Sequence, residues 1–298
     1  MNPAKTGRKS IYNMGIILSV AWIAFLFLSV SVSLTPLISY IIWAAKFQSI
    51  QLYVLIALGI PLCLTLSFLL LIGIAYLWSH LLPKTPNGRF KLLQDQGSTI
   101  WALNNAVPTL YLKWFQSTFF LNEHIRYLLL KAFNCDVQKS SWITSNAHIS
   151  DLRNLHFGKN VIIGEHVTIT ASLQPRPNSL IIADVYIGDN SMIGGLSGIS
   201  PGVSIGNDAK IGVNTLVGPS VTIGNGVTIG ANTSIAPNCT IGNKVRIGIS
   251  CTLIDKCTIP DNMRIPKGTT VTKAYLEGRE LEGQKPEGRE LENQQLEK

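Results

Sequence analysis

From Ile187 to Ile265, a branched aliphatic residue occupies every sixth position of the chain without exception. The fourteen positions are Ile187, Ile193, Ile199, Ile205, Ile211, Val217, Ile223, Ile229, Ile235, Ile241, Ile247, Leu253, Ile259 and Ile265. A period of six fits neither an α-helix nor a two-stranded hairpin, so it indicates a repeat architecture of its own.

The other positions of each hexapeptide are also restricted. Glycine often follows the aliphatic residue, and the fourth position favours residues that tolerate positive φ, such as Asn190, Asp208 and Asn214. We therefore expect each hexapeptide to form a short strand followed by a left-handed corner. Three strands would make one coil of 18 residues, so that residues 18 apart stack, with Cys239 beneath Cys257.

The repeats Ile-Gly-Asp-Asn-Ser-Met, Ile-Gly-Asn-Asp-Ala-Lys, Ile-Gly-Asn-Gly-Val-Thr and Ile-Gly-Ala-Asn-Thr-Ser resemble those of the hexapeptide-repeat acyltransferase family. The resemblance covers roughly residues 143–271 and implies a mainly β fold, the left-handed parallel β-helix. It also implies a homotrimer that takes acetyl-coenzyme A, or another acyl-coenzyme A, as its co-substrate.

Two places break the frame of the repeat. Two extra residues precede Phe157, and the stretch from Thr170 to Leu180 fits no repeat. That stretch contains Pro175 and Pro177, which cannot donate hydrogen bonds to a strand ladder, so we expect an extruded loop there.

Two apolar runs precede the repeat, at residues 11–45 and 52–78. Each is long enough to cross a bilayer as a helix, which takes about 20 residues. A cleaved signal peptide is the alternative for the first run, but the run is too long and lacks a small-residue cleavage site. Basic residues lie before the first run and after the second, which predicts an integral membrane protein of the inner or plasma membrane with its β-helix on the cytoplasmic side.

These features divide the chain into five segments. They are a cytoplasmic tail (1–10), a transmembrane helical hairpin (11–80), a juxtamembrane segment (81–142), the β-helix (143–272) and a charged, disordered tail (273–298). An aromatic and basic helix within residues 110–133 either lies in the membrane interface or covers the first coil of the β-helix, and one helix could do both. Outside the charged tail, the chain has a net positive charge, which suits binding to membrane lipid and to coenzyme A. No nucleic-acid-binding module is present in the sequence.

Members of the family generally use a histidine as the base that deprotonates the acyl acceptor, and this chain has three candidates. His166 lies at a predicted corner beside the extruded loop and is the first choice, although an ordinary solvated corner residue is the simpler interpretation. His156 is the second choice and His148 the third. Asp151 or Asp184 could orient the imidazole.

The resemblance also directs attention to exposed cations that could meet the phosphates of coenzyme A. The candidates are Arg176, Lys210, Lys244 and Arg246, although for any one of them an exposed charge that keeps the surface soluble is the simpler interpretation. Zinc, which the related trimeric carbonic anhydrases bind through histidines in the coils, is not expected, because the histidines of this chain lack the required arrangement.

Together these observations predict a membrane-anchored O-acetyltransferase whose acceptor is a lipid-linked or envelope glycan. The segment from about residue 80 onward also resembles, more loosely, the membrane terminal modules of some peptide synthetases, which would imply a peptide or amino-acyl acceptor. The alternative is a catalytically silent β-helix that serves as a scaffold or binds a ligand at the membrane.

Overall fold

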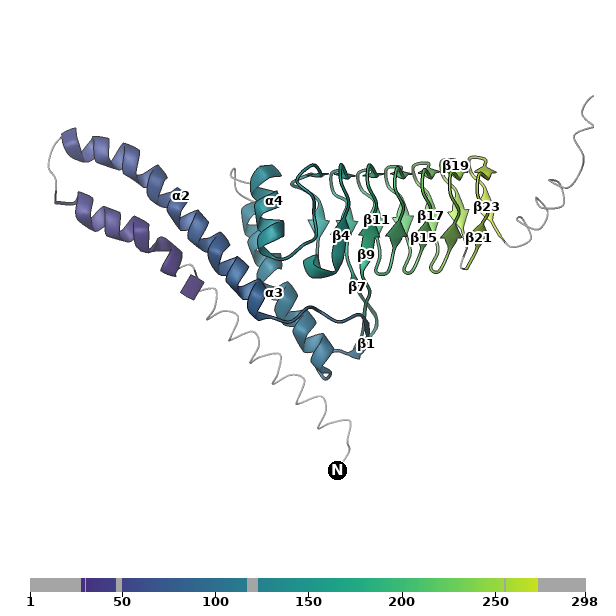
Figure 1. Cartoon of the computed structure of the whole chain (residues 1–298), viewed down its shortest axis with the longest axis horizontal. Coiled ribbons are helices and arrows are strands. Elements are labelled where there is room, and N and C mark those ends of the chain that lie inside the picture. Colours follow the sequence, from purple (N-terminus) through teal and green to yellow (C-terminus); the bar gives the residue numbers. More distant parts are fainter. Residues whose placement is uncertain (1–27, 30, 47–49, 117–122, 255, 273–298) are drawn as a thin grey trace, which may run out of the picture.

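The structure is a computed structural model that describes residues 28–29, 31–46, 50–116, 123–254 and 256–272. The predicted tails and about half of the first apolar run lie outside these residues. Figure 1 shows a long β-helix with helices packed against one end.

The β-helix has three parallel sheets, which we call faces 1, 2 and 3. Face 1 contains β2 (Trp142–Ile143), β5 (Ile162–Ile163), β10 (Met192–Ile193), β13 (Lys210–Ile211), β16 (Thr228–Ile229), β19 (Arg246–Ile247) and β22 (Arg264–Ile265). Face 2 contains β3 (His148–Ile149), β6 (Thr168–Ile169), β11 (Gly198–Ile199), β14 (Leu216–Val217), β17 (Ser234–Ile235), β20 (Thr252–Leu253) and β23 (Thr270–Val271). Face 3 contains β4 (Leu155–Phe157), β9 (Val185–Ile187), β12 (Ser204–Ile205), β15 (Thr222–Ile223), β18 (Thr240–Ile241) and β21 (Thr258–Ile259). The predicted three-sided parallel β-helix is confirmed, and its left-handed winding stays a prediction.

The repeat positions have the predicted roles. Residues 18 apart pair in register, as Ile205 does with Ile187 and Ile223, and these aliphatic side chains are buried inside the coils. Asn190 has the predicted positive φ, 57°. Glycine follows the aliphatic residue because the coils stack closely, since a Cβ at Gly212 would lie 2.4 Å from the nitrogen of Ala231.

The predicted extruded loop is a β-hairpin. β7 (Ser172–Arg176) and β8 (Ser179–Ile182) pair antiparallel, with an irregularity between Leu173 and Arg176 that accommodates Pro175. Far upstream in sequence, β1 (Gly88–Lys91) adds a third strand along β8, which the sequence did not predict. The hairpin leaves the β-helix at the edge between faces 2 and 3, which we call the 2–3 edge. The two extra residues before Phe157 lie at the same edge, in a short 3₁₀ helix at 152–154.

Two helices follow β1, namely α3 (Gln96–Gln116) and α4 (Glu123–Ala132). Leu129 and Leu130 of α4 are buried in the same core as Ile143 of the first coil, so α4 covers the open end of the β-helix. The buried guanidinium of Arg126 donates hydrogen bonds to the carbonyl oxygens of Ser145 (2.5 Å) and Ala147 (2.6 Å). These carbonyls belong to the first coil, so no preceding coil is present to donate hydrogen bonds to them. Burial lowers the pKa of Arg126 to about 10.

α2 (Ile50–Leu81) is mostly apolar, and its second half packs on α4. Leu71 and Ala75 join the core, and the Ser79 hydroxyl donates to the carbonyl of Ala132 at 2.6 Å. Among the described residues, one stretch, Gly59–Leu81, is long and apolar enough to cross a membrane. The helix Ser31–Ala44 is shorter, so the transmembrane hairpin stays a prediction.

Candidate functional site

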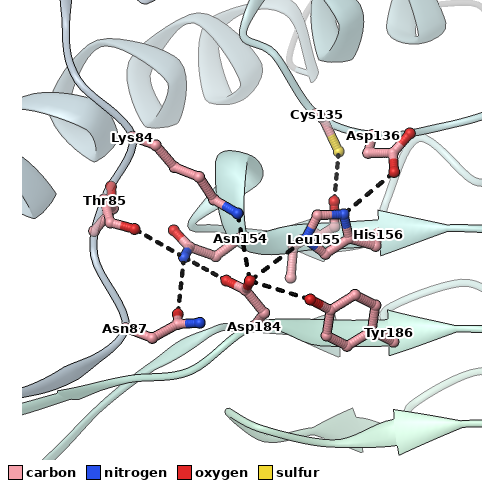
Figure 2. Close-up of polar contacts among 10 residues, drawn as sticks. All are labelled: Lys84, Thr85, Asn87, Cys135, Asp136, Asn154, Leu155, His156, Asp184 and Tyr186. Atoms are coloured by element: carbon pink, nitrogen blue, oxygen red, sulfur yellow. Dashed lines mark hydrogen bonds and ion pairs between the residues drawn. The ribbon is translucent and has the colours of Figure 1, made fainter.

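His156 lies on the outer side of face 3, where the side chains of Asp136, Asp184 and Tyr186 contact it (Figure 2). Its Nδ1 is 3.2 Å from Oδ2 of Asp136, and its Nε2 is 3.6 Å from Oδ2 of Asp184. The imidazole also stacks on the ring of Tyr186, with centroids 4.5 Å apart and planes 8° from parallel. An imidazole held between two carboxylates and an aromatic ring is the best-defined cluster of titratable groups on the β-helix.

β-Helix stacking brings these groups together. Asp136 forms a parallel bridge with His156, and β4 pairs with β9, which sets His156 against Tyr186. The intervening hairpin lengthens this coil, so His156 and Tyr186 are 30 residues apart instead of 18. Asp184 immediately precedes β9 at the 2–3 edge.

Asp184 is the fixed member of the cluster. One of its oxygens accepts a hydrogen bond from Asn154 Nδ2 at 2.6 Å. The other lies 3.4 Å from Lys84 Nζ and accepts a hydrogen bond from the Tyr186 hydroxyl at 3.3 Å (Figure 2). Burial by itself would raise the pKa of Asp184, but hydrogen bonds from Asn154 and Asn87 and the charge of Lys84 outweigh it and lower the pKa.

The two nitrogens of His156 have different surroundings. Nε2 is buried and has no hydrogen-bond partner among the described residues, although the Asp184 carboxylate faces it. Nδ1 faces Asp136, whose side chain is 56% exposed. A molecule arriving from solvent could therefore replace Asp136 at Nδ1 but could not reach Nε2.

The other candidate histidines lie elsewhere. His166 is at the corner between faces 1 and 2, with φ 55° as predicted for a corner, and it is exposed. This corner is opposite face 3, so one chain does not bring His166 and His156 together. His148 is exposed on face 2.

Asp151 has a role in packing and does not orient a histidine. Its carboxylate accepts hydrogen bonds from Trp101 Nε1 (2.6 Å), from Asn105 Nδ2, and from the hydroxyls of Thr170 and Ser172 (both 2.8 Å). It thereby fastens α3 to the 2–3 edge and to the base of the hairpin.

The four candidate cations are dispersed over the chain. Arg176 ends β7 of the hairpin, Lys210 and Arg246 point outward from face 1, and Lys244 is at the corner between faces 3 and 1 with φ 55°. Their roles stay predictions. Within the described ranges, no group of three or more His, Cys, Asp or Glu side chains could hold a metal ion.

The sequence prediction included His156 and Asp184 but missed three members of the cluster. Asp136 and Tyr186 could have been found only by counting coils across the interrupted frame. Lys84 is 100 residues from Asp184, and no local signal connected the two.

A comparison with protein families finds one match, which lies within the β-helix. Residues 184–219 and 202–237 match the family described as bacterial transferase hexapeptide (six repeats). No curated protein sequence matches the chain significantly.

Solved structures that match part of this chain include a mutant of perosamine N-acetyltransferase from Caulobacter crescentus, which is 20% identical with a TM-score of 0.36. That match covers 48% of this chain and 60% of the other. A hexapeptide-repeat acetyltransferase from Vibrio cholerae is 16% identical, with a TM-score of 0.37 over 56% of this chain and 86% of the other. A maltose O-acetyltransferase from Clostridium difficile is 16% identical, with a TM-score of 0.35 over 59% of this chain and 87% of the other. Within the β-helix, residues 184–237 therefore carry the similarity to the bacterial transferase hexapeptide family.

Proposed function

We propose that this protein is a membrane-anchored acyltransferase that moves an acetyl group from acetyl-coenzyme A to a hydroxyl of a lipid-linked or envelope glycan. The observation that carries the proposal is the contact of His156 with Asp136 and Asp184 on a hexapeptide β-helix. An imidazole oriented by a carboxylate is the group that removes a proton from an acceptor at neutral pH.

In this mechanism the Asp184 carboxylate, fixed by Asn154 and Lys84 and 3.6 Å from Nε2, favours the tautomer with the proton on Nε2 once Asp136 has left Nδ1. Nδ1 is then the nitrogen that accepts the proton of the acceptor hydroxyl, after the acceptor displaces the exposed Asp136. The oxygen attacks the thioester carbonyl, the carbon–sulfur bond breaks, and the thiolate of coenzyme A leaves and takes up a proton. His156 returns its proton to the thiolate or to water.

The attachment to a membrane is supported by α2. Leu62, Leu69 and Leu77 are 62%, 55% and 61% exposed on a helix with no acidic residue in its first turn and apolar side chains along most of its length. Lys84, three residues beyond the end of α2, reaches Asp184 of the site. A site fastened to the end of a membrane helix suits an acceptor that is itself anchored in lipid.

We include a homotrimer in the proposal. Leu196, Val213 and Ile249 are 59%, 48% and 52% exposed along the corner between faces 1 and 2, with Leu216 (56%) beside them. Exposed apolar side chains arranged along one edge suit burial against a second copy, which would also cover His166. The candidate cations for coenzyme A lie on separate sides of one chain, and a neighbouring copy could bring two of those sides together. The mass of the detergent-solubilised particle tests this part of the proposal.

The test of the activity is release of free thiol from acetyl-coenzyme A by the full chain reconstituted with membrane lipid. His156→Ala should abolish turnover and leave acetyl-coenzyme A binding unchanged, whereas His166→Ala should keep turnover. Loss of turnover in His166→Ala alone would overturn the assignment of the base and move the site to the opposite corner.

One observation favours a second candidate function. Both nitrogens of His156 face carboxylates, an arrangement that also stabilises a fold without any catalysis. A β-helix scaffold of this kind would neither bind acetyl-coenzyme A nor accelerate its hydrolysis, so the same assay separates the two functions.

A further inference from the structure

We propose that an apolar patch on face 1, made of Trp142, Ile162 and Met192, rests in the lipid interface of the membrane that α2 enters. The inference rests on the membrane attachment in the proposed function and adds a second contact with the bilayer, made by the β-helix itself.

The patch is continuous and exposed. The three side chains point outward from β2, β5 and β10, which pair in register, so they stack directly on one another. They are 50%, 43% and 42% exposed. They occupy the coils nearest to α4, which is the end of the β-helix against which α2 packs. A tryptophan at the end of an apolar surface is typical of a membrane interface, where the ring is buried and its N–H stays hydrated.

The position of the apolar patch relative to α2 follows from where α2 is attached to the β-helix. Arg153 at the 2–3 edge donates to the carbonyls of Leu82 (2.8 Å) and Pro83 (3.1 Å), just beyond the end of α2. In a three-sided β-helix, face 1 is opposite this edge. Figure 1 shows α2 running obliquely away from the covered end of the β-helix, from a point near the hairpin toward the side of the molecule opposite the hairpin. Face 1 lies on that opposite side, so the apolar first half of α2 extends away from the β-helix and toward the side of face 1.

The rest of face 1 has the charge that an anionic membrane surface would attract. Beyond Met192, the outward residues are Lys210, Thr228, Arg246 and Arg264, and no acidic residue points outward from any strand of this face. On face 1, the apolar residues are close to the membrane helix and the cations are farther away. This order suits a face whose apolar end lies in the lipid interface and whose cations lie near the anionic head groups. Faces 2 and 3 have no such series of outward apolar side chains followed by cations.

The test uses a fluorescent label on the full chain in vesicles that contain anionic lipid. Ile162→Cys places the label in the patch, and Thr168→Cys places it on face 2 of the same coil as a matched control. Thr228→Cys places it on face 1 far from α2. The five native cysteines are buried, so the introduced thiols are the ones that react. We expect spin-labelled lipids with the nitroxide near the head group to quench most of the emission at residue 162 and little of it at residues 168 and 228. Aqueous iodide should show the reverse order.

Three results would overturn the inference. Equal quenching by lipid at residues 162 and 168 would show no preferred face, and strong iodide quenching at 162 would show an open surface. A label at 162 that is shielded from both quenchers would mean that a second copy of the chain covers the patch. Retention of the protein on vesicles after an alkaline wash tests the membrane attachment separately. A retained protein without quenching at 162 would contradict this inference alone.

Discussion

Replacement of Asp184 by asparagine tests the proposed roles of the two histidine nitrogens. Asparagine keeps the shape of the side chain and one oxygen for the hydrogen bond from Asn154, but it removes the charge that faces Lys84 and His156. Its amide can place an N–H against Nε2 of His156. The imidazole would then carry its proton on Nδ1, the nitrogen that must be free to accept the proton of the acceptor.

The expected effect is on turnover rather than on binding. A positioned general base contributes roughly 10²- to 10⁴-fold to a rate. In Asp184→Asn the His156 imidazole would be in the tautomer that cannot act as the base, so kcat should fall by a factor within this range. The affinity for acetyl-coenzyme A should stay the same, because none of the candidate cations contacts Asp184 in the described structure. Asp136→Asn is the matched control, and we expect a smaller effect because Asp136 is exposed and must leave Nδ1 during the reaction.

Thiol release from acetyl-coenzyme A gives kcat, and calorimetry gives the binding constant, both on protein reconstituted with lipid. The unfolding temperature of each variant shows whether the fold persists. Full activity in Asp184→Asn together with a large loss in Asp136→Asn would contradict the assigned roles of the two carboxylates, because it would make Asp136 the orienting group and Nε2 the reactive nitrogen.

The remaining predictions concern stability, each measured by chemical or thermal unfolding of the full chain in detergent. The pKa of Asp184 is lowered from its ordinary 3.8, so the contribution of its carboxylate to stability is complete above about pH 4 and is lost as the pH falls through the lowered value. Asp184→Asn should therefore weaken the dependence of the unfolding free energy on acid pH. An unchanged dependence would contradict this role of Asp184. Arg126→Ala should destabilise the protein by about 2–4 kcal/mol, because it leaves two carbonyls of the first coil without a partner; an effect of a few tenths would show that water replaces the guanidinium. Ile223→Ala should cost about 2–5 kcal/mol as a fully buried side chain, whereas Thr222→Ala beside it on the outer surface should change little; equal effects would rule out the assigned orientation of the strand.

The β-helix could be predicted in detail because its determinants are local. The six-residue period, the glycine after each aliphatic residue and the left-handed corners each follow from neighbouring residues, and each recurs many times. Even the contact between Cys239 and Cys257, with their sulfur atoms 3.3 Å apart, followed from counting 18 residues.

The site could be predicted only in part, because its members are brought together by interruptions of the period. The rule of 18 residues pairs His156 with residue 174, whereas the hairpin shifts its partner to Tyr186. Arg126 illustrates a second limit. A basic residue on an amphipathic helix suggests contact with lipid or water, but this one is buried against carbonyls of the first coil. No pattern within α4 itself shows which surface the helix will cover.

A structure of the full chain in lipid nanodiscs with acetyl-coenzyme A bound is the most direct test of His156 as the base. We expect the thioester to lie beside face 3, with its carbonyl carbon close enough to His156 for an acceptor oxygen to lie between them. A thioester located at the corner that carries His166, with His156 still enclosed by Asp136 and Asp184, would contradict this assignment.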